Sequence, residues 1–177
     1  AVNVSPAQLA HPGFVLDVKT LLARTGLDPR RLGLEITENL LIRDADQALG
    51  TLRALKALGL RIIMDDFGSG YSSLRYFQLF PFDTIKVDRS FVAEMDRSPQ
   101  SMAVVQAAVG LGRGLGASVV AEGVETPRQL EHLRGLGCSH AQGFLFGKPA
   151  SIETFADLVH GRSSDAPAAP PARRAAA

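Results

Sequence analysis

The chain of 177 residues lacks several features that would mark a protein for a particular compartment or partner. It has a single cysteine, Cys138, so no disulfide can form within the chain, and a reducing cytoplasm fits best. No apolar run approaches the roughly 20 residues that a membrane helix needs. The formal net charge is only +1, so composition gives no reason to expect a nucleic-acid partner. The 46% of hydrophobic residues suffice for one globular core.

An initiator methionine, a basic leader and an apolar signal region are also absent from the start of the chain. It opens on Ala1-Val2-Asn3-Val4-Ser5, which is typical of the middle of a strand, so we expect an internal start. Residues 163–177 consist mostly of Ala, Pro, Ser and Arg and hold no large apolar side chain. We therefore expect a folded domain over residues 1–160 and a disordered tail over residues 161–177.

Six short apolar segments are typical of strands buried in a parallel sheet. Helical patterns lie between most of them. Residues 44–58 place apolar side chains at helical spacing before Gly59, and a second helix is predicted between Thr126-Pro127 and Gly137. This alternation predicts either an open doubly wound sheet or a closed (β/α)8 barrel. The predicted strands are residues 1–4, 32–36, 60–64, 84–87, 118–121 and 141–145.

Polar residues stand at or near the C-terminal end of almost every predicted strand, which is where a barrel builds its active site. This placement favours an α/β fold of the (β/α)8 TIM type over the open sheet. A barrel has eight strands in about 250 residues, so six strands indicate that about six of eight βα units are present and that the missing ones precede Ala1. In chain order the polar residues are Asn3, Glu35, Glu38, Asp65, Asp66, Lys86, Asp88, Glu122, Glu125 and Gln142.

The chemistry of this set points to a hard divalent cation. Glu35 and Lys86 lie inside apolar segments, and such residues are almost never fully buried without a partner. Oxygen ligands without nearby His or Cys select Mg²⁺, Mn²⁺ or Ca²⁺ over zinc. The adjacent Asp65 and Asp66 would point to opposite faces of a regular strand. Both can face one site only if the backbone turns there, which Gly68 and Gly70 would permit.

Each of these residues taken alone has a structural alternative. Glu38 or Asp88 could cap a helix or lie in a solvated loop. Lys86 could form a salt bridge within a barrel layer, and Asn3 or Gln142 could be a buried amide with satisfied hydrogen bonds. It is their joint occurrence at the ends of successive strands that favours a functional site.

Two further patterns carry less weight. Asp66-Phe67-Gly68 spells the metal-binding triplet of protein kinases, but the chain lacks the catalytic-loop and lysine-strand motifs that would accompany it. The histidines at positions 11, 132, 140 and 160 have no ligand spacing, and we assign none of them a catalytic role.

Six motifs in order make residues 2–155 similar to the EAL domain family. The resemblance implies a (β/α)8 barrel that hydrolyses the bacterial messenger cyclic di-GMP to linear pGpG, using two ions of Mg²⁺ or Mn²⁺. The motifs are Val2-Asn3-Val4-Ser5, Leu34-Glu35-Ile36-Thr37-Glu38, residues 65–74 (DDFGSGYSSL), residues 85–91 (IKVDRSF), residues 121–126 (AEGVET) and Gln142-Gly143-Phe144.

The resemblance also implies a role for each matching residue. Asn3, Glu35 and Asp65 resemble the ligands of one metal ion, and Asp65 is shared with a second ion that Asp66 approaches. Lys86 and Glu122 resemble the pair that orients and deprotonates the attacking water. Three residues resemble supports of the metals and of that pair, namely Asp88, Glu125 and Gln142. A mobile loop that couples dimerisation to metal binding is matched by Phe67, Gly68, Ser69, Gly70, Tyr71 and Ser72, with Glu38 as its anchor.

The Glu-Ala-Leu signature that names the family does not occur in the chain. We interpret this as truncation before Ala1, and expect the full-length parent to be active and this chain alone to be impaired. The expected partners are cyclic di-GMP, a second copy in a homodimer, and an upstream diguanylate-cyclase-like or sensory domain that could anchor the parent to a membrane. Two alternatives stay open: a catalytically silent cyclic di-GMP receptor, and a fragment without independent function.

Overall fold

The computed structural model describes residues 1–37, 45–69, 79–80, 82–149 and 151. Its strands form one parallel sheet of six strands in the order β1-β2-β3-β4-β5-β6, so each strand lies beside its predecessor in the chain. An open doubly wound sheet would reverse its order at a switch point, whereas a barrel keeps chain order. The strands are β1 (Val2–Asn3), β2 (Gly33–Thr37), β3 (Arg61–Phe67), β4 (Thr84–Val87), β5 (Ser118–Ala121) and β6 (His140–Ala141).

The predicted strand bounds are confirmed for β4 and β5 and nearly so for β1 and β2. The prediction for the last strand is wrong, because β6 ends at Ala141 and the chain turns at Gly143, where the Phe146 N–H donates to the Gly143 carbonyl at 3.1 Å. Strand β3 extends beyond its predicted end and includes both Asp65 and Asp66. The paired carboxylates therefore belong to the sheet itself.

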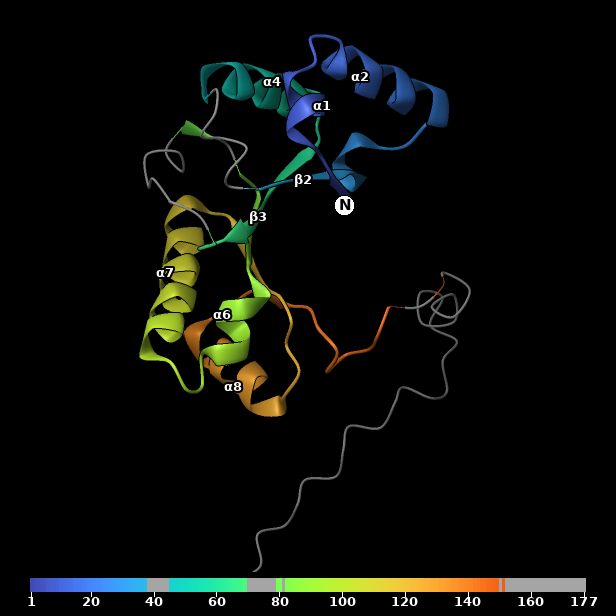
Figure 1. The fold of residues 1–177 in the computed structure, drawn as a ribbon. Helices are drawn as coiled ribbons and strands as arrows, with labels where there is room; N and C mark the ends of the chain where they lie inside the picture. The colour runs from blue at the N-terminus through green and yellow to red at the C-terminus, as the bar shows by residue number, and fades with distance from the viewer. Residues whose placement is uncertain (38–44, 70–78, 81, 150, 152–177) are drawn as a thin grey trace, which may run out of the picture. The chain divides into compact units, whose positions relative to one another are not determined.

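Helices connect successive strands of the sheet (Figure 1). Local capping explains where two of them begin and end. At α8, the Thr126 hydroxyl accepts a hydrogen bond from the Gln129 N–H at 3.2 Å, and Gly137 ends the helix with φ +81°, as predicted. At α7, Ser98 and Gly116 have the same two roles. The helical elements are α1 (Pro6–Ala10), α2 (Phe14–Thr25), the 3₁₀ turn η1 (Pro29–Arg31), α4 (Ala45–Ala57), α6 (Arg89–Glu94), α7 (Pro99–Leu115) and α8 (Pro127–Leu136).

The two faces of the sheet differ in polarity. One face packs against helices, with α4 on β3 and α7 on β4 and β5, and its side chains form the hydrophobic core. Alternate residues point to the opposite face, which carries the polar residues. The apolar face comprises Leu34, Ile36, Ile62, Met64, Ile85, Val87, Val119 and Ala121, all buried.

Close packing of α7 on β5 requires a glycine at position 112. A β-carbon there would lie 2.3 Å from Val119 Cγ2 and 3.0 Å from the Ala117 carbonyl oxygen. We expect Gly112→Ala to lower the free energy of unfolding by about 1–3 kcal/mol, because the helix must move away from the sheet. Gly114→Ala on the same helix is the control, since a β-carbon there meets nothing within 4 Å, and it should stabilise by about 0.5–1 kcal/mol. Urea denaturation measures both, and equal effects would contradict this account.

Candidate functional site

Strand register places the predicted site residues on the polar face of the sheet. Asn3 of β1 pairs with Glu35 of β2, and Thr37 of β2 pairs with Asp65 of β3. Paired residues in a parallel sheet share a face, so Asn3, Glu35 and Asp65 lie on one side. Lys86 of β4 joins them there through ion pairs. The sheet thus brings together residues that are far apart in the sequence.

Lys86 is the centre of this group. Its Nζ lies 2.8 Å from Asp65 Oδ1, 2.8 Å from Glu122 Oε1 and 3.2 Å from Glu35 Oε2. Burial by itself would lower the pKa of the Lys86 ammonium, but hydrogen bonds to Asp65 and Glu122 outweigh burial and raise that pKa above its ordinary value. Lys86 therefore remains a cation that compensates three carboxylates.

A β-bulge explains how two adjacent aspartates reach the same site. The pairing of β3 with β4 shifts between Met64 and Phe67, so β3 carries one more residue than β4 across this stretch. Asp66 lies in the bulge and has φ +54°, a left-handed conformation that aspartate tolerates better than most residues. The predicted turn exists, but it starts at Asp66 itself, before Gly68 with φ +95°.

Carboxylates crowd the end of β3 beside Lys86. One oxygen from each of Asp65, Asp66 and Glu122 lies within 4.8 Å of the others, a spacing that could hold a metal ion. Burial raises the pKa of Asp66, and the charges of Asp65 and Asp88 raise it further. Burial also raises the pKa of Glu122, although Lys86 acts in the opposite direction. A bound cation would relieve this repulsion, and oxygen donors suit a hard divalent ion.

We expect Asp66→Asn to stabilise the protein at pH 7 in the presence of EDTA. The pKa of Asp66 in the folded protein lies above its ordinary value of 3.8. Ionisation of Asp66 therefore lowers the free energy of unfolding as the pH rises through the folded pKa. Asparagine removes that loss and still accepts a positive φ. The melting temperature should rise at pH 7 and stay unchanged at pH 3, where the carboxyl is protonated in both states.

Asp66→Ala is the matched variant for the backbone. It removes the same charge but accepts φ +54° less readily, so it should be about 1–2 kcal/mol less stable than Asp66→Asn. The asparagine variant should also bind Mn²⁺ more weakly than the unaltered protein. A melting temperature at pH 7 below that of the unaltered protein would contradict the proposed repulsion.

The residues predicted as supports have structural partners of their own. Asp88 is the N-cap of α6, where its Oδ1 accepts a hydrogen bond from the Ser90 N–H at 2.8 Å. Burial acts to raise the pKa of Asp88, but the hydrogen bonds from Ser90 outweigh burial and lower that pKa. Glu125 and Gln142 are exposed. Their support of a metal remains a prediction, and so does the role of the exposed Asn3.

Only part of the predicted loop lies in the described residues. Phe67 is buried in the core, and Ser69 donates from its N–H and its hydroxyl to the Asp66 carbonyl at 3.1 and 2.8 Å. A β-carbon at Gly68 would lie 2.8 Å from the Phe91 ring. These contacts hold the start of the loop against α6. The other predicted loop residues, Glu38, Gly70, Tyr71 and Ser72, lie outside the described residues.

Two features of the site are not evident from the motifs. The family resemblance implies a role in proton transfer for Glu122, yet its carboxylate also lies within the group that could hold a metal ion. Gly143 was part of a motif without a structural reason, but a β-carbon there would lie 2.2 Å from both Val124 N and Val124 O. The position of Glu122 just after a predicted strand is the only sequence signal for its place among the metal-binding carboxylates, and no sequence signal indicates the close approach of Gly143 to Val124.

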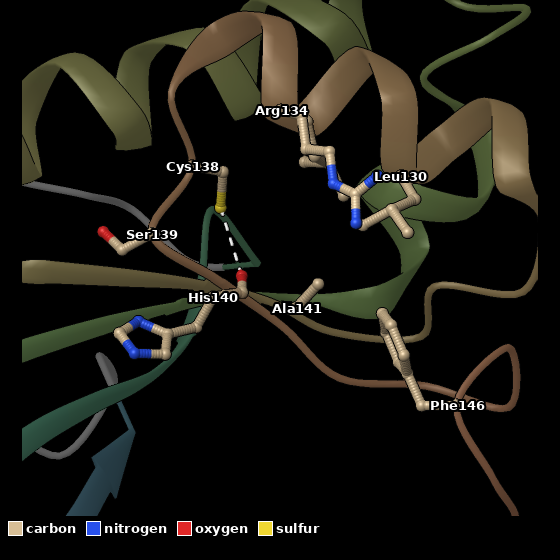
Figure 2. A pocket seen from close by; sticks show the side chains of 8 residues that line it. Leu130, Arg134, Cys138, Ser139, His140, Ala141 and Phe146 are labelled. Carbon is tan, nitrogen blue, oxygen red and sulfur yellow. Dashed lines mark hydrogen bonds between the residues drawn. The ribbon is translucent and has the colours of Figure 1, made fainter. Parts of the chain in front are cut away.

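A separate pocket lies between α8 and β6 (Figure 2). The Cys138 thiol donates to the His140 carbonyl at 3.3 Å, and burial raises the pKa of that thiol, so it is a poor nucleophile. No carboxylate lines this pocket, which therefore differs chemically from the Lys86 site. The lining residues are Leu130, Leu133, Arg134, Cys138, Ser139, His140, Ala141 and Phe146.

None of the helices in the described part of the chain combines the length and the apolar character that a membrane crossing requires.

Comparisons of the sequence with family profiles and with curated proteins agree with one another. The sequence profile described as the EAL domain matches residues 1–149. The bifunctional diguanylate cyclase/cyclic di-GMP phosphodiesterase MucR of Pseudomonas aeruginosa is 48% identical over 153 residues, which are 86% of this chain and 22% of MucR. The chain spans about a fifth to two fifths of the length of the curated relatives that it matches.

Solved structures resemble this fold closely. A complex of the PaMucR phosphodiesterase with c-di-GMP has a TM-score of 0.83 and 47% identity, covering 87% of this chain and 62% of that chain. A complex of BlrP1 from Klebsiella pneumoniae with manganese and cyclic di-GMP has a TM-score of 0.78 and 38% identity, covering 84% of this chain and 38% of that chain. These likenesses agree with the six parallel strands and with a barrel fold.

Proposed function

Because the chain belongs to the EAL domain family, we propose that the intact protein hydrolyses cyclic di-GMP to linear pGpG with divalent cations. The observation that carries this proposal is the contact of Lys86 with Glu35, Asp65 and Glu122, beside the Asp65–Asp66 bulge. The similarity to a phosphodiesterase solved with c-di-GMP supports the same substrate.

The donor set fits Mg²⁺ or Mn²⁺, in two adjacent positions. Asn3, Glu35 and Asp65 would hold one ion, and Asp65 with Asp66 would hold the second. All these donors are oxygens, and burial together with the charges of Asp65 and Asp88 raises the pKa of Asp66 despite the charge of Lys86, so a bound cation would stabilise its anion. Divalent ions bound there would lower the pKa of a water molecule and neutralise charge on the phosphodiester.

Glu122 and Lys86 would supply proton transfer and charge stabilisation, respectively. Glu122 would accept the proton of the attacking water, and its pKa, raised by burial, makes its carboxylate a stronger base. Lys86 donates to Glu122 Oε1 at 2.8 Å, which orients that carboxylate and places a positive charge beside the anionic substrate.

The further roles belong to the same proposal. Asp88, Glu125 and Gln142 would support the metal-binding residues, and the loop that starts at Phe67 would link metal binding to association of two copies. We also propose a cytoplasmic location, which fits the single cysteine, and a further signalling domain in the intact protein, since the matched relatives are much longer.

Incubation of the intact protein with cyclic di-GMP and Mg²⁺ or Mn²⁺, followed by chromatographic separation of nucleotides, tests the proposal. We expect pGpG to form and EDTA to abolish its formation. Cyclic di-GMP that stays uncleaved with either ion would refute hydrolysis. Binding of the dinucleotide without cleavage would instead support the alternative of a silent receptor.

A further inference from the structure

Two of the carboxylates at the site could bind either the Lys86 ammonium or a metal ion. Asp65 and Glu122 each form an ion pair with the Lys86 ammonium at 2.8 Å. The same two residues, with Asp66, form the group whose oxygens could hold a metal ion. A metal ion that binds these carboxylates must therefore share them with the ammonium.

The sheet places Lys86 among these carboxylates. It lies on β4 between Ile85 and Val87, both fully buried, and its own side chain is only 11% exposed. Its third partner, Glu35 at 3.2 Å, comes from β2 on the other side of β3. Burial and three ion pairs from neighbouring segments thus favour an ammonium within ion-pair distance of the proposed metal ligands.

We infer that the Lys86 ammonium competes with a divalent cation for Asp65 and Glu122, so that Lys86 weakens metal binding while stabilising the metal-free site. This inference rests on the metal site of the proposed function. Two like charges sharing ligands repel each other, and the repulsion is strong where water is partly excluded. Without a metal ion, the ammonium compensates carboxylates that would otherwise repel one another.

Titration of the intact protein with MnCl₂ by calorimetry tests the competition. For Lys86→Met we expect a Kd for Mn²⁺ that is at least about tenfold lower, because the competing charge is gone. The melting temperature in EDTA should fall, and the rise in melting temperature on adding Mn²⁺ should become larger. Lys86→Arg keeps the charge and should not tighten binding.

Lys56→Met is the matched control. Lys56 also pairs with a carboxylate, that of Asp83 at 2.5 Å, but it lies on α4 outside the site. Its loss should leave the Kd for Mn²⁺ unchanged. If Lys86→Met folds poorly, Lys86→Gln supplies the same neutralisation with a polar side chain, and tightening in either variant supports the inference.

The outcomes separate the inference from the proposed function. Unaltered protein that binds Mn²⁺, together with neutral variants that bind it equally or more weakly, overturns the competition alone. Absence of Mn²⁺ binding at millimolar concentration in the unaltered protein and in both neutral variants overturns the metal site and the competition together.

Discussion

Replacing Glu122 by glutamine should lower kcat for cyclic di-GMP by about 10²- to 10⁴-fold, the usual contribution of a positioned general base. The amide can no longer accept the proton of the attacking water. Its oxygen can still accept the hydrogen bond that Lys86 Nζ now donates to Glu122 Oε1 at 2.8 Å, so the local geometry should survive. Steady-state kinetics in saturating Mn²⁺ measure the loss.

The same variant distinguishes a base from a metal ligand, since Glu122 also lies in the group that could hold an ion. A loss of kcat that persists at high Mn²⁺ indicates a base, whereas recovery at high Mn²⁺ indicates a ligand. Glu131→Gln on the exposed side of α8 is the control and should retain activity. A fall in kcat of less than about fivefold at saturating metal would contradict the role of Glu122 as the general base.

Gly143→Ala should lower the free energy of unfolding by about 3 kcal/mol, at the upper end of the usual cost of overpacking. A β-carbon at residue 143 would lie 2.2 Å from Val124 N and from Val124 O, and backbone atoms cannot rotate away. Both atoms are hydrogen-bonded, because Val124 N–H donates to the Gln142 carbonyl and Leu145 N–H donates to the Val124 carbonyl, each at 3.0 Å. Moving the segment around Gly143 away from Val124 would therefore weaken both hydrogen bonds.

Thermal and urea denaturation measure this effect. Gly135→Ala is the matched control, since residue 135 lies in α8 and a β-carbon there meets nothing within 4 Å. It should be neutral or stabilise by about 0.5–1 kcal/mol. A Gly143→Ala variant that melts within a degree or two of the unaltered protein would show that the two segments can separate at little cost.

The strands and helix ends that the sequence predicts correctly are determined by residues close together in the chain. The bounds of β4 and β5 follow from apolar runs, and the ends of α8 follow from the hydroxyl of Thr126 and the left-handed conformation of Gly137. The error at β6 has the same origin: the apolar run continues past Ala141 to Leu145, but the strand stops where Gly143 turns the chain.

The features of the site also separate into those set by local sequence and those set by contacts between distant segments. The residue types at the ends of the strands, and hence an oxygen-rich set suited to a divalent cation, follow from local sequence alone, because strand ends and side-chain chemistry are local properties. The contact of Lys86 with Glu35, 51 positions away, and with Asp65 and Glu122 is visible only in the folded chain. The same holds for the bulge that turns Asp65 and Asp66 toward one place, and for the close approach of Gly143 to Val124. These contacts depend on strand register and on packing between distant segments, which no local pattern specifies.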